Sequence, residues 1–475
     1  MNTSSRTTQL LEGSIIRSLL TLALPIVLTN LLQSGYQLTD AFWVGRLGGE
    51  AVAAVSVSFP IIFLMIALGA GFSIAGSTLV AQYTGARNDR MVNHVTAQTL
   101  IMVLLSAITL GIIGFVCAPG ILRLIGVEPS VFNQALGFLR VSFVGMLFMF
   151  TFASFQSIMN AIGQTRIPTM IVFGTVLLNL LLDPLFIFGW GPIPGLGVMG
   201  AALATVGTQF LASLIGLIIL LRGNYGIKLH LRDFTPDRTY IKRAFKLGFP
   251  ASIEQSSRAL GMSVLTFLVA SFGTLSVAAY GVGGNVTMIV IIPAFGLSIA
   301  IGVLVGQNIG AGKIERAQAV AKLGQWLSFI TLTVCGLLAF TFAHHIARFF
   351  VPGDADVIRE GARFIQIMSF SFGLIGVQMA VNGILRAAGN MMAPMMMTIV
   401  SQWVVLFPLA YILSKHTDFG ITGLWYAFPI ANVIMVVIAL VWFNKIPWQT
   451  KNLTKEDHEE IRATQEILIE EGVRG

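Results

Sequence analysis

The sequence predicts an all-α integral membrane protein whose twelve transmembrane helices form two bundles of six. Three observations lead to this fold class: an apolar composition, long apolar runs along the whole chain, and an internal repeat. Of the 475 residues, 55 % are hydrophobic and 11 % are charged, and the mean hydropathy is +0.83. A soluble domain has about 25 % charged residues. This composition excludes a soluble domain with one anchor, a disordered chain and a coiled coil.

The apolar runs supply the twelve helices in order. A helix that spans a bilayer needs about 20 mostly apolar residues. Runs of this length begin near residues 19, 52, 95, 132, 166 and 198, and then near residues 247, 276, 321, 362, 391 and 420. We therefore expect a first bundle over residues 1–221, a basic linker over 222–246, a second bundle over 247–442 and a charged tail over 443–475.

The distribution of basic residues predicts the orientation of the spans. With both chain ends in the cytoplasm, the inside segments hold roughly three times as many Lys and Arg as the outside segments. Arg258 is the basic residue placed within a span, and Arg386 is assigned to an inside loop. The formal net charge of +8 is then explained by loops that face anionic lipid, and a nucleic-acid partner is not expected.

An internal repeat divides the chain into two halves. A shift of 225 residues places Pro25 opposite Pro250 and Gly71 opposite Gly296 without gaps. The same shift aligns the segment 80–86 (VAQYTGA) with the segment 305–311 (VGQNIGA). Each half has an even number of spans, so the halves run parallel to each other. This arrangement is typical of transporters that rock two bundles around a central site.

Three acidic residues fall inside the predicted spans, namely Asp40, Asp183 and Glu254. An ionised carboxylate in hydrocarbon is costly, so each must face a cavity or a partner, and each is a candidate functional residue. The alternative is a set of hydrogen-bonded acids that only hold spans together. The chain has no Ser/His/Asp, nucleotide-binding or Cys-x-x-Cys pattern, so neither an enzyme nor a bound cofactor is predicted.

Asp40 ends a polar stripe on the first span, and Tyr36 lies four residues before it. The stripe has spacings of three and four residues, which put its members on one helix face: Asn30, Gln33, Gln37 and Asp40.

The fifth span repeats this design with Thr175, Asn179 and Asp183, each four residues apart. Both spans run outward, and the two carboxyl groups lie at similar depths. Two carboxyl groups in a poorly solvated site can hold one shared proton near neutral pH. The alternative ligand is Na⁺, bound through the oxygens of Asp40, Asp183 and Asn179. No other metal site is predicted.

The second half lacks this acid pair, because the repeat places Leu265 opposite Asp40. Glu254 lies four residues before Arg258, a spacing suited to an ion pair on one helix. This pair has either a structural or gating role or a direct role in transport. Gln378 and Asn382 add uncharged polar groups that are consistent with a cavity wall.

The sequence resembles the MATE (multidrug and toxic compound extrusion) family, and within it the DinF-like bacterial branch. The residues that carry this resemblance are segment 36–48 (YQLTDAFWVGRLG), segment 178–184 (LNLLLDP), the paired segments 80–86 and 305–311, and the helix starts at Pro25 and Pro250. The resemblance implies a V-shaped pair of six-helix bundles. It also implies cation-coupled export of organic, often cationic, compounds.

Carried over residue by residue, the coupling site of this branch corresponds to five residues of the two stripes and to one threonine of the sixth span: Gln33, Tyr36, Asp40, Asn179, Asp183 and Thr205. Gln156 stands where the family often has Asn, and Asn160 stands where Arg is common. These departures favour H⁺ over Na⁺ as the coupling ion.

We therefore predict a monomeric multidrug efflux antiporter of the bacterial cytoplasmic (inner) membrane, with both termini in the cytoplasm and small organic molecules as substrates. The alternative is a flippase or exporter of a lipid-linked compound or of one specific metabolite.

Overall fold

The computed structural model describes residues 3–191, 193–223, 225–450 and 453–454, and most of the predicted tail lies outside these residues. Nearly the whole described chain is helical. Among the described residues, strands occur in one short antiparallel hairpin of β1 (Gly189–Trp190) and β2 (Ile193–Pro194). The predicted all-α membrane fold is therefore confirmed.

The first half of the chain forms one lobe. After α1 (Thr3–Glu12), its helices are α2 (Ile15–Gly45), α3 (Gly49–Gly85), α4 (Asp89–Ile125), α5 (Pro129–Ala161), α6 (Arg166–Phe188) and α7 (Val198–Arg222). Short turns join these helices, and some of the helices are followed by a residue whose backbone conformation ends a helix. Gly126, for example, follows α4 with φ = 77°, a left-handed conformation that glycine adopts without a steric cost.

The second half forms the other lobe. The connecting segment contains the short helix η1 (Leu231–Phe234), and the lobe then begins within the predicted linker. Its helices are α8 (Arg238–Ala270), α9 (Thr274–Gly310), α10 (Ile314–Phe350), α11 (Ala355–Ser369), α12 (Phe372–Ala387), α13 (Met392–Ile399), the π-helix η2 (Val400–Leu406), α14 (Phe407–Lys415) and α15 (Ile421–Lys445), followed by η3 (Trp448–Thr450).

Ten of the described helical segments are long and apolar enough to cross a membrane, and α11 with α12 makes an eleventh crossing that is bent by 52°. The remaining predicted span, which begins near residue 247, corresponds to α8. This 33-residue helix is less apolar than the others because it contains Glu254, Gln255 and Arg258. It lies against α3 and α9 within the helical bundle.

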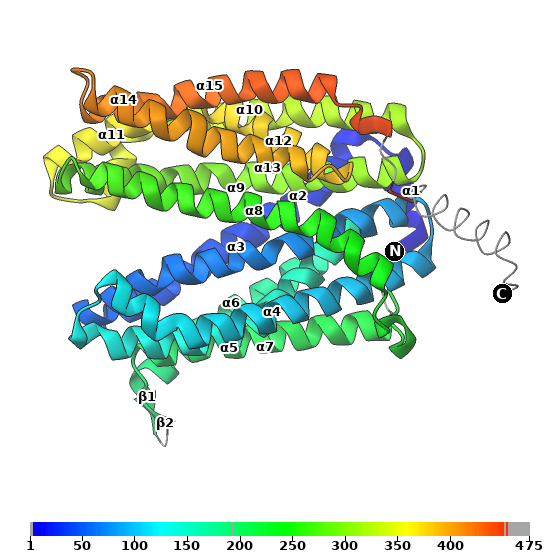
Figure 1. Ribbon diagram of the computed structural model, residues 1–475, viewed down its shortest axis with the longest axis horizontal. Helices are drawn as coiled ribbons and strands as arrows, with labels where there is room; N and C mark the ends of the chain where they lie inside the picture. Colours follow the sequence, from blue (N-terminus) through cyan, green and yellow to red (C-terminus); the bar gives the residue numbers. More distant parts are fainter. Residues whose placement is uncertain (1–2, 192, 224, 451–452, 455–475) are drawn as a thin grey trace, which may run out of the picture.

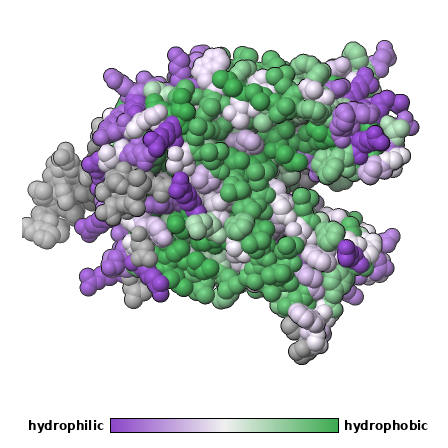
Figure 2. Space-filling model, turned by 180° about the vertical axis from the view of Figure 1, so that it is seen from behind, coloured by the Kyte–Doolittle hydropathy of each residue, from purple (hydrophilic) through white to green (hydrophobic). Residues whose placement is uncertain are grey.

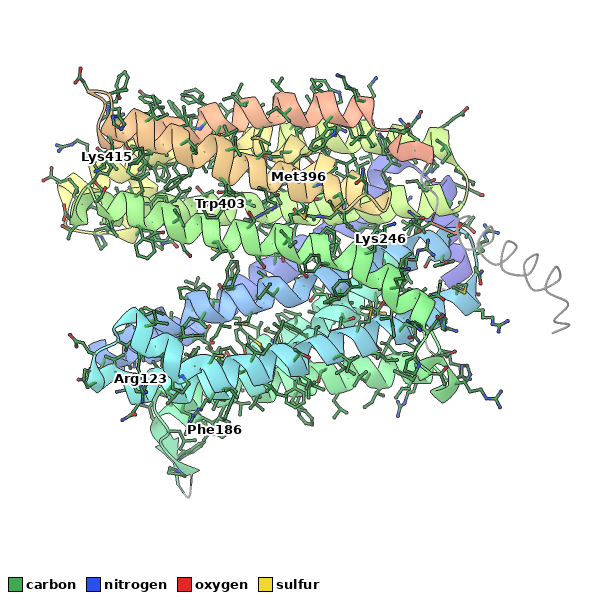
Figure 3. All side chains as sticks on the ribbon, in the orientation of Figure 1. Arg123, Phe186, Lys246, Met396, Trp403 and Lys415 are labelled. Atoms are coloured by element: carbon green, nitrogen blue, oxygen red, sulfur yellow. The ribbon has the colours of Figure 1, made fainter. Side chains whose placement is uncertain are left out.

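The two lobes form a V (Figure 1). They meet at the end of the molecule where both chain termini lie, and they separate toward the opposite end. The space-filling view shows the resulting notch between the lobes and a broad apolar band across the middle of the face seen there (Figure 2). Lys246 lies toward the end where the lobes meet, whereas Arg123 and Lys415 lie at the open end (Figure 3).

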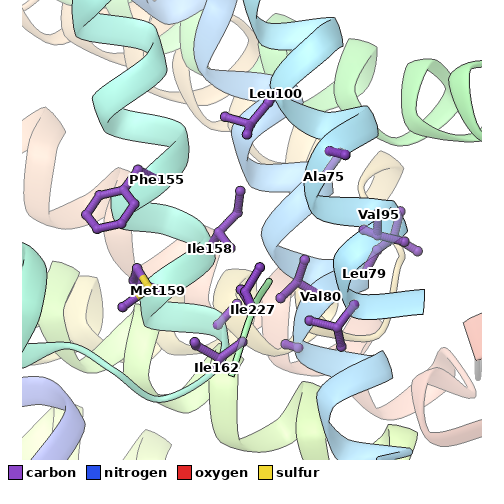
Figure 4. Close-up of a cluster of buried hydrophobic side chains, with 14 of the residues drawn as sticks. Ala75, Leu79, Val80, Val95, Leu100, Phe155, Ile158, Met159, Ile162 and Ile227 are labelled. Carbon is purple, nitrogen blue, oxygen red and sulfur yellow. The ribbon is translucent and has the colours of Figure 1, made fainter. Parts of the chain in front are cut away.

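The core of the first lobe lies near the end where the lobes meet. Side chains of α3, α4 and α5 interdigitate there with Ile227 of the connecting segment (Figure 4). Phe155 and Ile158 of α5 and Leu79 of α3 are among its fully buried members. The helices of this lobe are thus held firmly at one end, while the polar stripes of α2 and α6 lie farther along the lobe.

Candidate ion-coupling site

Three helices of the first lobe bring the predicted polar residues together. α2 carries Tyr36 and Asp40, α6 carries Asn179 and Asp183, and α7 carries Thr205. α6 packs against both α2 and α7. Asp40 and Asp183 both lie in the last two turns of their helices. The stripe of α6 is buried within the lobe, and Asp40 at the end of the α2 stripe is partly buried, whereas Gln33 and Gln37 of α2 are exposed.

The acid pair is the centre of the site. The side chains of Asn179 and Asp183 are completely buried, and the carboxyl groups of Asp40 and Asp183 are close enough to interact directly. The Asn179 amide donates a hydrogen bond to Oδ1 of Asp183 at 3.0 Å. The Thr205 hydroxyl donates to Oδ2 of Asp40 at 3.2 Å. The structure thus places these four predicted residues in one cluster.

A hydroxyl pair extends the cluster toward the middle of the lobe. The hydroxyl oxygens of Tyr36 and Thr208 lie 2.8 Å apart, and the Thr208 hydroxyl also lies 2.8 Å from the carbonyl oxygen of Thr205. Sequence reasoning missed Thr208. The available signal was its position three residues after Thr205, which puts both hydroxyl groups on one side of α7.

Three buried oxygen atoms of the cluster have no hydrogen-bond partner among the described residues: Oδ1 of Asp40, Oδ2 of Asp183 and Oδ1 of Asn179. Buried polar atoms are normally paired, so an unpaired group indicates a proton, an ion or a water. A proton on one carboxyl group would turn an acceptor into a donor and pair two of these atoms. A small cation could instead bind several of the oxygens. The site is therefore chemically suited to bind a cation.

The other predicted polar residues of the first lobe stand apart from this hydrogen-bond network. Gln33 and Gln37 of α2 are exposed, and Gln156 of α5 is half-buried. The hydrogen bonds described for the acid cluster do not involve them. Their roles in ion coupling or substrate binding stay predictions.

The second lobe contains a different charged cluster. Glu254 is completely buried and accepts a hydrogen bond from Arg258 at 3.3 Å, as the spacing predicted. It also accepts two hydrogen bonds from Arg386, one of them from Nε at 3.2 Å. The assignment of Arg386 to a loop was wrong, because α12 extends to Ala387 and carries this arginine beside α8. One carboxylate therefore faces two guanidinium groups.

Further polar groups of the second lobe lie on α12 and η2. Asn382 is buried, its Oδ1 atom has no partner among the described residues, and Gln378 is half-buried. The indole Nε1 of Trp403 donates to the Ser257 hydroxyl at 2.8 Å. This hydrogen bond places Trp403, labelled in Figure 3, against α8. A π-helix such as η2 is often found at functional sites.

Two repeated helical lobes meet at one end, and among the described residues a buried acid pair lies in the first of them; this arrangement defines a membrane transporter with a candidate ion site in one lobe. A family comparison identifies which transporters these are. The MatE family model matches residues 25–185 and 250–412, two segments that start at the paired residues Pro25 and Pro250. The chain belongs to the MATE family of transporters.

Relatives cover almost the entire chain. A probable multidrug resistance protein, YoeA of Bacillus subtilis, is 30 % identical over 448 residues, which are 94 % of this chain and 96 % of YoeA. An FAD transporter of Shewanella oneidensis is 26 % identical over 427 residues, covering 90 % of this chain and 94 % of that protein. An outward-facing structure of a multidrug resistance MATE family transporter superposes with a TM-score of 0.86 at 25 % identity, covering 92 % of this chain and 97 % of that one.

Proposed function

We propose that this protein is a proton-coupled multidrug efflux antiporter that exports organic, often cationic, compounds. The observation that carries the proposal is the buried pair of Asp40 and Asp183 with its unpartnered oxygen atoms. The multidrug names of relatives such as YoeA support the substrate class.

The proposed orientation puts the termini and the closed end of the V in the cytoplasm. The concentration of basic residues at that end, including Lys246 (Figure 3), supports this orientation through the positive-inside rule. The open end then faces the outside, as expected for a monomer of a bacterial inner membrane at the stage that releases substrate. A proton from outside would reach the acid pair from this end.

The residues of the cluster have distinct roles in the proposed cycle. Asp40 and Asp183 hold the proton, and Asn179 and Thr205 fix the orientation of the two carboxyl groups. The hydroxyl pair of Tyr36 and Thr208 ties α2 to α7. Proton binding then favours a different packing of α2, which bends most readily at Pro25. Export requires only that the two states of the transporter differ in their affinity for the proton and for the drug.

We infer H⁺ as the coupling ion because the unpartnered atoms include one oxygen from each carboxyl group, and a shared proton pairs them. Na⁺ would need several oxygen ligands at once. In this chain the Thr205 hydroxyl already makes a hydrogen bond, which it donates to a carboxylate oxygen of the acid pair.

The test uses purified protein in vesicles with an imposed pH gradient or, separately, an imposed Na⁺ gradient. A pH gradient should drive accumulation of a fluorescent organic cation, and a Na⁺ gradient alone should not. Asp40→Asn and Asp183→Asn should abolish the driven transport, whereas Asp89→Asn, which changes an exposed carboxyl of the same lobe, should not. Driven transport by Asp40→Asn at the unmodified rate would refute the assignment.

A second candidate function is export of an anionic, phosphate-bearing compound. The observation that favours it is the excess positive charge beside Glu254: the carboxylate is fully buried, while the Arg258 side chain is 31 % exposed. One of the relatives is named an FAD transporter, and FAD is an anionic, phosphate-bearing compound. Competition for export between a fluorescent cation and FAD distinguishes the two functions, because FAD should not compete if the substrates are cations.

A further inference from the structure

The closed end of the V is built from close backbone contacts between the lobes. A Cβ atom added to Gly71 of α3 would lie 2.2 Å from the carbonyl oxygen of Gly248 in α8. A Cβ atom added to Gly296 of α9 would lie 2.4 Å from the side-chain Cγ2 of Val27 and 3.2 Å from the carbonyl oxygen of Ala23, both in α2. Gly71 and Gly296 are equivalent in the repeat, so the two contacts are copies of each other. We call this set of contacts the seam.

Beyond these glycines, two buried glutamines cross the seam in opposite directions. Nε2 of Gln82, in α3, donates to the carbonyl oxygen of Ala387 at the end of α12, at 2.7 Å. Nε2 of Gln307, in α9, donates to the carbonyl oxygen of Ala161 at the end of α5, at 2.8 Å. Both glutamines are completely buried. Each one satisfies a carbonyl group that has no partner within its own helix, because it lies in the last turn.

The C-terminal segment adds a third component on one side. The backbone N–H of Leu453 donates to Oε1 of Gln82 at 2.9 Å, and the carbonyl oxygen of Leu453 accepts a hydrogen bond from Arg243. The Leu453 side chain lies against Gly389. The corresponding Oε1 atom of Gln307 has no partner among the described residues. The two halves of the seam are therefore equivalent except for this segment.

We propose that Gln82, Gln307 and Leu453 form the inner gate of the transporter. The hydrogen bonds from the two glutamine side chains hold the lobes together at the end where the termini lie. The hydrogen bond from the Leu453 backbone stabilises the position of Gln82 in addition. The gate opens when both glutamines release the opposite helix end. The glutamines are positioning residues, since they control access and do not contact the acid pair. The role as a gate rests on the proposed transport function, whereas the effect on opening does not.

The test measures how often the seam opens. Ala81 is buried and lies across the seam from Gly306, so Ala81→Cys places a thiol inside the seam. With Cys117 and Cys335 replaced by alanine, a small thiol reagent should modify this cysteine only when the lobes separate. When reclosing is fast, the modification rate is proportional to the population of the open state. The measurement uses the full-length protein in lipid vesicles, without drug or ion gradient.

Each of the two glutamines makes a buried hydrogen bond across the seam. The loss of one such bond shifts the equilibrium between the closed and the open seam by about 5-fold. Gln307→Met, which keeps the side-chain length, should therefore raise the modification rate about 5-fold. Gln82→Met, which also loses the hydrogen bond from Leu453, should raise it about 25-fold, and the double variant should raise it more than either single variant. Leu453→Pro removes the N–H donor and should raise the rate more than Leu453→Ala. Asn308→Ala is the matched control, because the Asn308 amide is equally buried and its hydrogen bond among the described residues goes to Leu304 of the same helix.

Equal modification rates in the unmodified protein and the double Gln→Met variant would overturn the proposal. So would an equal increase in Asn308→Ala, because it would show general loosening of α9. A failure of Asp40→Asn to abolish transport would refute the proposed coupling site and leave this measurement unaffected. The two proposals can therefore fail separately.

Discussion

Glu254→Gln should strongly destabilise the second lobe. The Glu254 side chain is completely buried, whereas Arg258 is 31 % exposed and Arg386 is 20 % exposed. The glutamine amide would leave two guanidinium groups side by side without a counter-charge. Removing one member of a buried ion pair costs about 3–5 kcal/mol. Because both arginines are partly exposed and can recover some hydration, we expect a loss near the lower limit, about 3 kcal/mol.

Thermal unfolding in detergent measures this loss. At roughly 2 °C per kcal/mol for a large chain, the midpoint should fall by about 6 °C. The control is the double variant Glu254→Gln with Arg386→Gln, which removes one positive charge together with the negative one and should recover most of the midpoint. An unchanged midpoint for Glu254→Gln would refute the reasoning. Additive losses in the double variant would refute it equally, since independent sites add and paired sites do not.

Gly310→Ala should open the seam, because the added Cβ atom would lie 1.9 Å from the carbonyl oxygen of Gln82. The thiol reagent should then modify the cysteine of Ala81→Cys faster. Gly207→Ala, whose added Cβ atom meets nothing within 4 Å, should leave that rate unchanged. Asp237→Ala should lower stability by about 1 kcal/mol at pH 7, because this carboxylate accepts hydrogen bonds from two amides at the start of α8. Partial burial raises the pKa of the Asp237 carboxyl. The hydrogen bonds from those amides and from a neighbouring histidine together lower it by more than burial raises it, so the pKa lies below its usual value. Its contribution is therefore present above about pH 4 and is lost as the pH falls through the lowered pKa, which unfolding at several pH values will show. Tyr36→Phe should reduce coupled transport about 5-fold without abolishing it, because one hydrogen bond to α7 is lost, and complete loss in the vesicle assay would contradict this role.

The acid cluster could be predicted largely from the sequence because its signal is local. A carboxylate in an apolar span is costly, and the spacings of three and four residues show which side chains share its face. Thr208 gave only the weaker signal of its spacing from Thr205, since a threonine in an apolar helix commonly bonds to the carbonyl group of the preceding turn, as this one also does. Its contact with Tyr36 depends on how α2 and α7 pack.

Arg386 shows the limit of hydropathy as a guide. The apolar run of the tenth span ends before this residue, so the arginine was assigned to a loop, but the helix continues to Ala387 because Glu254 on a different helix neutralises the charge. The crossed amides are a similar case. The repeat aligned Gln82 with Gln307, but only the arrangement of the lobes shows that each glutamine reaches the opposite half.

Under the proposed proton coupling, the restriction of the acid pair to one lobe limits the work that one transport cycle can do. Two carboxyl groups can release at most two protons per cycle, and one pH unit supplies about 1.4 kcal/mol for each proton. A single shared proton therefore supports about a tenfold concentration ratio of a neutral drug per pH unit, and two protons support about a hundredfold ratio. A second acid pair at Leu265 and its surroundings would have raised this ceiling. The proposed exchange therefore uses few protons per cycle, because the second lobe holds Glu254 in an ion-paired cluster in place of an acid pair.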